Sequence, residues 1–226
     1  MNNKEEFMTI VYLIRHSVRM DQNVIISNNT KQSEIIQYEK IILSVEGEKK
    51  ASLLSKEEEL QNLDVIYASN CVRTLQTAKY FLESQNLNVT IDDRLDERRK
   101  GISNDKLFPD WFERQYLDEN FKTEGGESRK EVTKRISECF YEIIKKHKGK
   151  RIAIFSHGYA ITFFLLKFCK LQNINDRRLT YKFKDKLVFD KIINAPEVFK
   201  LTINDQEEVV DIELIEFDNI PFNHGV

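Results

Sequence analysis

The sequence predicts an α/β protein with three layers, in which helices cover both faces of a mostly parallel sheet and a β-hairpin ends the chain. Short apolar runs alternate with segments of helical periodicity, as in strand–helix–strand units. Three of these runs, Thr9–Ile14, Asp64–Ser69 and Arg151–Phe155, lack a polar–apolar alternation, which is typical of strands buried on both faces. Two later runs, Val198–Ile203 and Val209–Phe217, are joined by the turn-rich "NDQEE" and predict the hairpin.

The first half of the chain predicts two helices between these strands. Ser44 is a residue that favours an N-cap, and the helix after it would turn three apolar side chains inward, those of Ala51, Leu54 and Leu60. A second helix is expected at Val72–Leu82, and a short strand at Val89–Asp92. Residues 22–40 are mostly polar and irregular, and they indicate at most a short helix near Glu34–Ile42.

The second half predicts two more helices. Gly125 and Gly126 interrupt the chain, and Ser128 then forms a capping box with Glu131. The helix that follows has one apolar face, made by Val132, Ile136, Phe140, Ile143 and Ile144. Another helix is expected at Gly158–Leu171, and no element is assigned to residues 172–197.

Residues 1–226 are expected to form a single domain, because no repeat, low-complexity stretch or linker-like segment interrupts them. Residues 101–124 are rich in aromatic side chains, which are Phe108, Trp111, Phe112, Tyr116 and Phe121. This segment is interpreted either as a cap that selects the substrate or as a packed helix without contact to it.

Composition limits the classes of function. The chain has 226 residues, 41% hydrophobic and 32% charged, with a formal net charge of −2, which disfavours nucleic acid as a partner. No apolar run approaches the ~20 residues that span a bilayer, and no signal peptide is evident, so a cytoplasmic protein without a membrane partner is expected. Cys71, Cys139 and Cys169 show no pairing pattern and are expected to be reduced and buried.

Candidate functional residues follow three of the predicted strands. The first strand ends before Arg15 and His16, and the strand at Arg151–Phe155 ends before Ser156, His157 and Gly158. The strand at Asp64–Ser69 is followed by Arg73. Each feature alone is as well explained by a capped turn or a solvated side chain. Together they predict a site, because open α/β sheets bind ligands at the carboxyl ends of their strands.

Two arginines beside a histidine favour a tetrahedral anion. The guanidinium group presents a planar set of donors that matches phosphate oxygens. A neutral imidazole can attack phosphorus and form a phosphohistidine, while arginines and a second histidine stabilise the charge of the transition state. Backbone N–H groups of the helix near Gly158 are expected to point at the same anion. A carboxylic acid must protonate the leaving group, and "IDDRLDERRKG" offers candidates, of which Glu97 is favoured.

The sequence resembles the histidine phosphatase superfamily, the phosphoglycerate mutase-like group, over roughly Thr9–Leu171. "LIRHSVR" is similar to the family's Leu-Ile-Arg-His-Gly signature, and "ILSVEGEKKASLL", "YASNCVRTLQTA", "LDERRKG", "EGGES" and "FSHG" follow in the family's order. The resemblance implies the phosphoglycerate mutase-like fold and no metal or organic cofactor.

The same resemblance implies roles for individual residues. His16 would be the phosphorylated nucleophile, Glu97 the proton donor and His157 the second histidine, while Arg15 and Arg73 would bind the phosphate. Ser17 replaces the family's usual glycine and is expected to join the phosphate-binding residues, because it keeps the N–H and adds a hydroxyl.

The expected function is therefore hydrolysis of phosphomonoesters, with a small phosphorylated metabolite or a phosphoprotein as substrate. A phosphoglycerate mutase is the first alternative. It is disfavoured because "NVIISNNTKQSEIIQYEKI" lacks the tryptophan of mutases and residues 101–124 are compact. A catalytically silent phosphate-recognising module is the second, and a metal site at His16, His157 and a cysteine is weaker still. The sequence names neither the natural substrate nor the oligomeric state.

Overall fold

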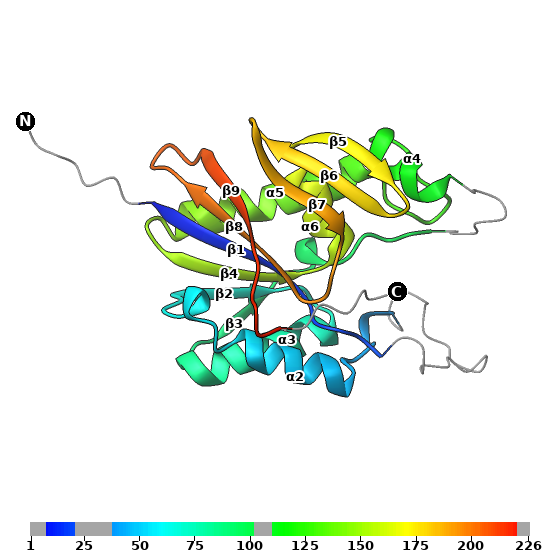
Figure 1. Cartoon of the computed structure of the whole chain (residues 1–226). Helices are drawn as coiled ribbons and strands as arrows, with labels where there is room; N and C mark the ends of the chain where they lie inside the picture. Colours follow the sequence, from blue (N-terminus) through cyan, green and yellow to red (C-terminus); the bar gives the residue numbers. More distant parts are fainter. Residues whose placement is uncertain (1–7, 21–37, 102–109, 221–226) are drawn as a thin grey trace, which may run out of the picture.

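The computed structural model describes residues 8–20, 38–101 and 110–220 and shows a mixed α/β fold around a six-stranded sheet. The strand order is β3-β2-β4-β1-β8-β9, and the first four strands in that order run parallel (Figure 1). The strands are β1 (Thr9–Arg15), β2 (Val65–Ala68), β3 (Val89–Ile91), β4 (Arg151–Ser156), β8 (Glu197–Ile203) and β9 (Val209–Ile215). The predicted hairpin is confirmed: β8 and β9 are antiparallel, and β8 extends the sheet beside β1.

Helices cover both faces of this sheet, as predicted. α2 (Val45–Leu54) and α3 (Val72–Gln85) lie below it in Figure 1, and α5 (Arg129–Lys146) and α6 (Gly158–Leu165) lie above. Alternate side chains of β1 enter two different hydrophobic clusters. Val11 and Leu13 belong to the cluster that contains α5 and α6, whereas Tyr12 and Ile14 belong to the cluster of α2 and α3. Both faces of β1 are therefore buried, which explains its unbroken apolar sequence.

Two helix starts are fixed by the caps that the sequence predicts. The Ser44 hydroxyl accepts a hydrogen bond from the Gly47 N–H at 3.0 Å, so Ser44 is the N-cap of α2. Ser128 and Glu131 form the complete capping box of α5. Gly47 also allows a close approach, because a Cβ at this position would lie 2.0 Å from the Val18 carbonyl oxygen. The segment after His16 is thereby packed directly onto α2.

A second sheet was not predicted. The expected helix Gly158–Leu171 is too long, because α6 ends at Leu165 and β5 (Lys170–Asn175) begins five residues later. β5, β6 (Arg178–Phe183) and β7 (Lys186–Ile192) form an antiparallel sheet within the stretch left unassigned. Its aromatic side chains join the main core: Tyr181 stacks on Phe189 with ring centroids 5.1 Å apart, and Phe189 contacts Phe199 of β8.

The candidate cap contains one described helix, α4 (Trp111–Leu117), while residues 102–109 lie outside the described part of the chain. Trp111 and Tyr116 are buried against Tyr159 and Phe163 of α6, so these two aromatic residues pack into the core. Two single 3-10 turns, η2 (Glu58–Leu60) and η3 (Asp93–Leu95), complete the elements. Of the short helix expected near Glu34–Ile42, Tyr38 and Glu39 are helical, and residues 34–37 are not described.

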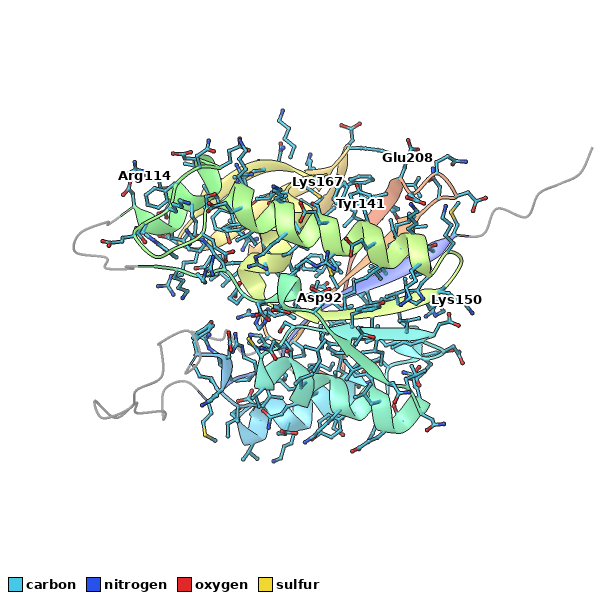
Figure 2. All side chains as sticks on the ribbon, turned by 180° about the vertical axis from the view of Figure 1, so that it is seen from behind. Asp92, Arg114, Tyr141, Lys150, Lys167 and Glu208 are labelled. Carbon is cyan, nitrogen blue, oxygen red and sulfur yellow. The ribbon has the colours of Figure 1, made fainter. Side chains whose placement is uncertain are left out.

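The outer face of α5 carries a groove of about 670 Å³ between this helix and the end of α6. Figure 2 shows this face, where the Lys167 ammonium lies 4.5 Å from the centre of the Tyr141 ring. None of the lining residues is a predicted site residue. Cys71, Cys139 and Cys169 are buried free thiols, as predicted. Within the described ranges, no helix combines the length and the apolar character needed to cross a membrane.

Candidate active site

Three parallel strands deliver the predicted site residues to one edge of the sheet. Arg15, the last residue of β1, pairs with Ser156 of β4, and the His16 N–H donates to the Ser156 carbonyl at 3.0 Å. On the other side of β4, the Ser69 N–H donates to the Phe155 carbonyl at 3.0 Å. The rings of His16 and His157 therefore meet, with centroids 5.1 Å apart and an edge-on arrangement. The sequence predicted that His16 and His157 lie close together, because each follows the carboxyl end of a parallel strand.

The surroundings of His16 keep its imidazole neutral and leave Nε2 unprotonated. The ring is 2% exposed, and Nδ1 lies 2.7 Å from the carbonyl oxygen of Ser17. A carbonyl can only accept a hydrogen bond, so Nδ1 carries the proton and Nε2 keeps its lone pair. Burial, followed by the positive charges of Arg73 and Arg15, places the pKa of His16 well below its ordinary value of 6.5.

His157 is fixed in the opposite tautomer. The Nη2 group of Arg73 donates to His157 Nδ1 at 3.0 Å, and because a guanidinium cannot accept, Nδ1 is the unprotonated nitrogen. Nε2 then carries the proton and donates to the Ser69 hydroxyl at 2.7 Å. Burial and the charge of Arg73 place the pKa of His157 well below 6.5. Ser69 also follows the end of a parallel strand, so its place in the sequence could have identified it as a site residue.

Arg73 is anchored by a residue that the sequence did not single out. Its side chain is fully buried in the first turn of α3, and Nη1 donates to the Tyr38 carbonyl at 2.9 Å. The guanidinium carbon lies 4.5 Å from the centre of the Tyr38 ring, and the Tyr38 hydroxyl accepts from Arg19 at 2.8 Å. Tyr38 therefore contacts both arginines, Arg73 through its carbonyl and ring and Arg19 through its hydroxyl. Tyr38 lies 35 positions from Arg73 in the chain, so local sequence patterns could not predict this contact.

Arg15 is fixed from the opposite side of the site. Its Nη1 group donates to the carbonyl oxygens of Ile193 and Asn194 at 3.1 and 2.7 Å, in the connection between β7 and β8. Burial lowers the pKa of Arg15, opposed by the charges of Glu197 and Glu97. A Cβ at Gly158 would lie 3.3 Å from Arg15 Nε, so glycine lets the start of α6 approach the guanidinium.

Three buried polar atoms beside His16 have no hydrogen-bond partner within the described part of the chain: Arg15 Nε, Arg73 Nε and the Ser17 hydroxyl. Buried donors normally find a partner, so their common place in the fold indicates a site for an acceptor-rich ligand. The Ser17 N–H is already used, because it donates to the Thr77 hydroxyl at 3.0 Å. The Ser17 hydroxyl is therefore the group through which this residue could bind a phosphate, and the role of Ser17 stays a prediction.

Glu97 lies beside this site, at the first turn of α6. Its carboxylate accepts from the backbone N–H groups of Ala160 at 3.1 Å and Tyr159 at 3.4 Å. N–H groups near Gly158 were expected to face the phosphate; those of Tyr159 and Ala160 bind Glu97 instead. A carboxylate at a helix N-terminus is electrostatically favourable, so α6 positions Glu97 next to its own N-cap, His157.

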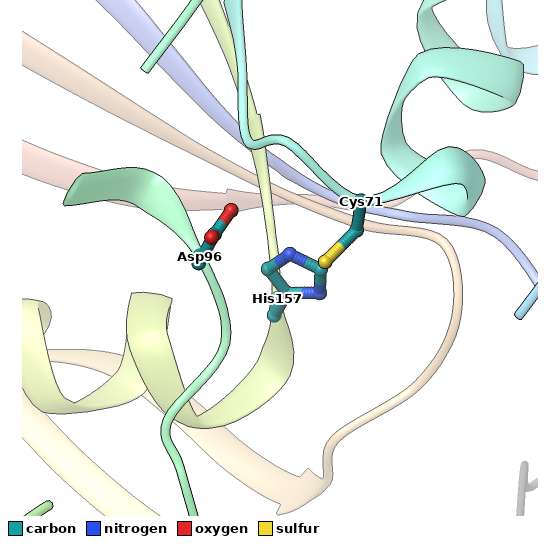
Figure 3. A group of neighbouring side chains, drawn as sticks. All are labelled: Cys71, Asp96 and His157. Atoms are coloured by element: carbon teal, nitrogen blue, oxygen red, sulfur yellow. The ribbon is translucent and has the colours of Figure 1, made fainter. Parts of the chain in front are cut away.

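Cys71, Asp96 and His157 form a further cluster, with one ligand-type atom of each within 4.8 Å of the others (Figure 3). Both ring nitrogens of His157 are already committed to Ser69 and Arg73, so the cluster offers no free imidazole nitrogen to a metal. Burial raises the pKa of Asp96 to about 6, against a hydrogen bond from the Asn70 N–H. Asp96 is thus a second acid close to His157.

The fold brings these residues together at one edge of an α/β sheet, and residues 11–183 match the model of the histidine phosphatase superfamily (branch 1). The chain belongs to this superfamily. The phosphoserine phosphatase 1 of Hydrogenobacter thermophilus is 36% identical over 124 residues, which are 51% of this chain and 58% of that protein. This match thus spans less than two thirds of that relative's length. A probable phosphoglycerate mutase of Yersinia enterocolitica is 29% identical over 61% of this chain and 67% of its own.

Solved structures show the same fold over nearly the whole chain. The mycobacterial glucosyl-3-phosphoglycerate phosphatase superposes with a TM-score of 0.64 at 18% identity, covering 93% of this chain and 99% of that one. A putative alpha-ribazole-5′-P phosphatase from Escherichia coli gives a TM-score of 0.60 at 17% identity, covering 94% and 98%. The histidine phosphatase fold predicted from the sequence is confirmed.

Proposed function

We propose that this protein is a phosphatase that hydrolyses phosphomonoesters of small metabolites through a phosphohistidine on His16. The observation that carries this is a neutral, buried imidazole whose Nε2 is unprotonated, beside two buried arginine Nε groups that have no hydrogen-bond partner among the described residues. Such a site attracts a phosphate dianion and presents a nucleophile to its phosphorus. Phosphatases among the related proteins and similar structures support the same class of reaction.

The first step transfers the phosphoryl group to the enzyme. His16 Nε2 attacks phosphorus while the bond between phosphorus and the ester oxygen breaks, and protonated Glu97 gives its proton to the leaving alkoxide. Arg15, Arg73 and the Ser17 hydroxyl stabilise the oxygens of the transferring group, with His157 beside them. Removing one such donor is expected to lower kcat about 100-fold or more.

The second step returns the enzyme to its starting state. Glu97, now a carboxylate, takes a proton from a water molecule that attacks phosphorus. The bond between His16 Nε2 and phosphorus breaks, and inorganic phosphate leaves with the oxygen of that water. Apart from the substrate and this water molecule, every group in these two steps is a side chain of this chain.

Trapping the phosphoenzyme tests the proposal. A ³²P-labelled phosphomonoester, quenched within milliseconds, should leave a label on the protein that is stable to base and labile to acid. The label should map to His16 and be absent from a folded His16→Asn protein. A label that persists in His16→Asn, or undiminished phosphatase activity of that variant, would contradict the proposal.

The alternatives give different outcomes in the same experiment. A mutase would pass the label to a second hydroxyl and convert 3-phosphoglycerate to 2-phosphoglycerate faster than it releases phosphate. A silent module would bind orthophosphate without forming a labelled protein. Release of phosphate at the rate at which the label turns over is the result expected here.

A further inference from the structure

The groove on the outer face of α5 shares no residue with the candidate active site. One wall is a row of side chains at every fourth position of α5, which are Arg129, Thr133, Ser137 and Tyr141. At the rise of an α-helix this row is about 18 Å long. The end of α6 provides the other wall, and the Thr133 hydroxyl donates to the Phe163 carbonyl at 3.0 Å. This hydrogen bond fixes the two walls to each other.

Part of the groove is apolar. Tyr141 and Leu166 are partly buried and pack against the main core, of which Phe163 is a fully buried member. The volume of about 670 Å³ lies within the range of ~300–1,000 Å³ that is typical of sites for small organic ligands. The groove therefore has both the room and the apolar surface that the body of an organic molecule requires.

The rim of the groove is positively charged. Its charged residues are four cations and two acids, which are Arg129, Lys130, Lys134, Lys167, Glu119 and Glu138. Lys130 lies 3.8 Å from the Glu119 carboxylate. Within the described ranges, no ion pair uses Arg129, Lys134 or Lys167, and the Lys167 ammonium lies over the Tyr141 ring instead (Figure 2). Three positive charges are thus left to attract an anion.

Two buried polar atoms in the α5 wall have no hydrogen-bond partner in the part of the chain that the structure describes. They are Arg129 Nε and the Ser137 hydroxyl oxygen. A serine inside a helix often donates to a carbonyl of the preceding turn, and Ser137 makes no such bond. Because buried donors normally find an acceptor, these two atoms indicate a ligand that brings oxygen atoms into the groove.

The end of α6 does not repel an anion from this place. The last carbonyls of a helix carry a partial negative charge, and those of α6 are all engaged. The carbonyls of Thr162, Phe164 and Leu165 accept from backbone N–H groups of the next turn, and that of Phe163 accepts from Thr133. The cations of the rim therefore dominate the electrostatic potential of the groove.

We propose that the groove between α5 and α6 binds a small aromatic anion, with a carboxylate, sulfonate or phosphate as its acidic group. The aromatic body packs on Tyr141 and Leu166, and the acidic group is bound by Arg129, Lys134 and Lys167. Charge complementarity favours this occupant over a neutral molecule, and the two donors without partners favour oxygen acceptors over a purely apolar surface. The inference is independent of the proposed phosphatase function, because the pocket at His16 lies elsewhere.

Two matched fluorescent probes test the site. Anilinonaphthalene sulfonate has the aromatic rings of phenylnaphthylamine and one additional sulfonate. In titrations of the wild-type protein at low salt, the sulfonate probe should bind once per chain and about tenfold more tightly than the neutral probe. Orthovanadate, which is expected to bind in the pocket at His16, should not displace it.

Variants assign the binding to the groove. A triple variant with Arg129→Gln, Lys134→Gln and Lys167→Gln should bind both probes alike, and each single change should weaken the sulfonate probe about threefold. Lys146→Gln is the matched control, because Lys146 is exposed in the last turn of α5 and does not line the groove. It should leave both affinities unchanged. Tyr141→Ser should weaken both probes by a similar factor, because the aromatic rings of both pack on Tyr141.

Four outcomes would overturn this site. Equal affinity of the wild type for the two probes, or an unchanged preference in a triple variant with the wild-type melting temperature, would show that these cations bind no anion. Displacement by orthovanadate would place the probe in the pocket at His16. A dimer in sedimentation equilibrium that excludes the probe and dissociates in the triple variant would assign the groove to a second copy of the chain.

Discussion

Arg15 and Glu197 are the last residue pair of the antiparallel β1–β8 ladder, so a carboxyl group lies directly across the sheet from the arginine next to His16. Glu197 is 4% exposed, and its carboxylate lies 3.7 Å from the Lys191 ammonium. Burial raises the pKa of Glu197 to about 7, against the positive charges of Lys191 and Arg15. The carboxyl group therefore changes charge close to neutral pH.

This pKa predicts a pH-dependent stability. Between the ordinary value of 4.5 and the folded value of about 7, the folded protein holds a proton on Glu197 that the unfolded chain has lost. The stabilising contribution is complete below pH 4.5 and disappears as the pH rises through about 7. Glu197→Gln cannot titrate, so its free energy of unfolding relative to wild type should rise by at most about 3 kcal/mol across this window.

Urea denaturation at several pH values measures this difference. Glu216→Gln is the control, because Glu216 also contacts Lys191 but is exposed. A Glu197→Gln curve that runs parallel to the wild-type curve at every pH would show that Glu197 does not titrate in this range.

Replacing Arg73 should weaken the binding of tetrahedral anions. Arg73→Ala removes the guanidinium that links His157 to Tyr38, and kcat/KM should fall about 100- to 1,000-fold. Orthovanadate, measured as a competitive inhibitor, should lose a similar factor in affinity, and Arg73→Lys should recover part of it. Arg98→Lys is the control, since Arg98 is buried elsewhere and should affect thermal stability rather than vanadate binding. Tight vanadate inhibition of Arg73→Ala would rule out the pocket as described.

Glu97 and Asp96 compete for the role of proton donor, and leaving-group dependence separates them. Glu97→Gln should slow the hydrolysis of alkyl phosphates far more than that of para-nitrophenyl phosphate, whose leaving oxygen needs little protonation. Asp96→Asn should affect both esters alike, because Asp96 is bonded to the Asn70 N–H and lies beside His157 in the cluster with Cys71. The reverse pattern would assign the acid to Asp96.

Ser69 should act as a positioning residue for His157. Ser69→Ala leaves the proton on His157 Nε2 without its acceptor, which costs about 1–3 kcal/mol of stability. A kcat about tenfold lower is expected as well, because the freed ring can adopt the other tautomer and release Arg73. Ser55→Ala removes another buried hydroxyl hydrogen bond, to the Ser52 carbonyl, and should lower stability without changing kcat. A normal kcat for Ser69→Ala would leave Ser69 with a purely structural role.

The sequence predicted the layers of the fold because the main elements carry strong local signals. β1 and β4 are apolar on both faces, and α5 has a regular apolar face and a capping box. β5 to β7 were missed for a physical reason. The apolar residues of α6 run on through Leu171, so the helix looked longer than it is, and the strands beyond are rich in lysine. The alternation of Leu179, Tyr181 and Phe183 in β6 was the signal that could have revealed this sheet.

The part of the candidate site that lies at the ends of the parallel strands could be predicted from the sequence. Arg15, His16 and His157 follow strands whose neighbours could be deduced, and the structure brings them together. Tyr38 could not be found in this way, since it reaches Arg73 from a segment without a strong local pattern. The sequence also did not predict that Glu97 binds the N–H groups at the start of α6, because this contact depends on the path of the backbone around Glu97.

The position of β1 and β4 in the sheet determines how the protein loses activity. These two strands are the central pair of six, and each is hydrogen-bonded on both edges. Amide hydrogens in the interior of a sheet exchange with solvent through the largest openings, whereas edge strands such as β3 and β9 open locally at lower free energy. His16 and His157 are therefore held on the part of the fold that opens last. Fraying at either margin leaves their alignment intact, and inactivation by denaturant should coincide with the global transition.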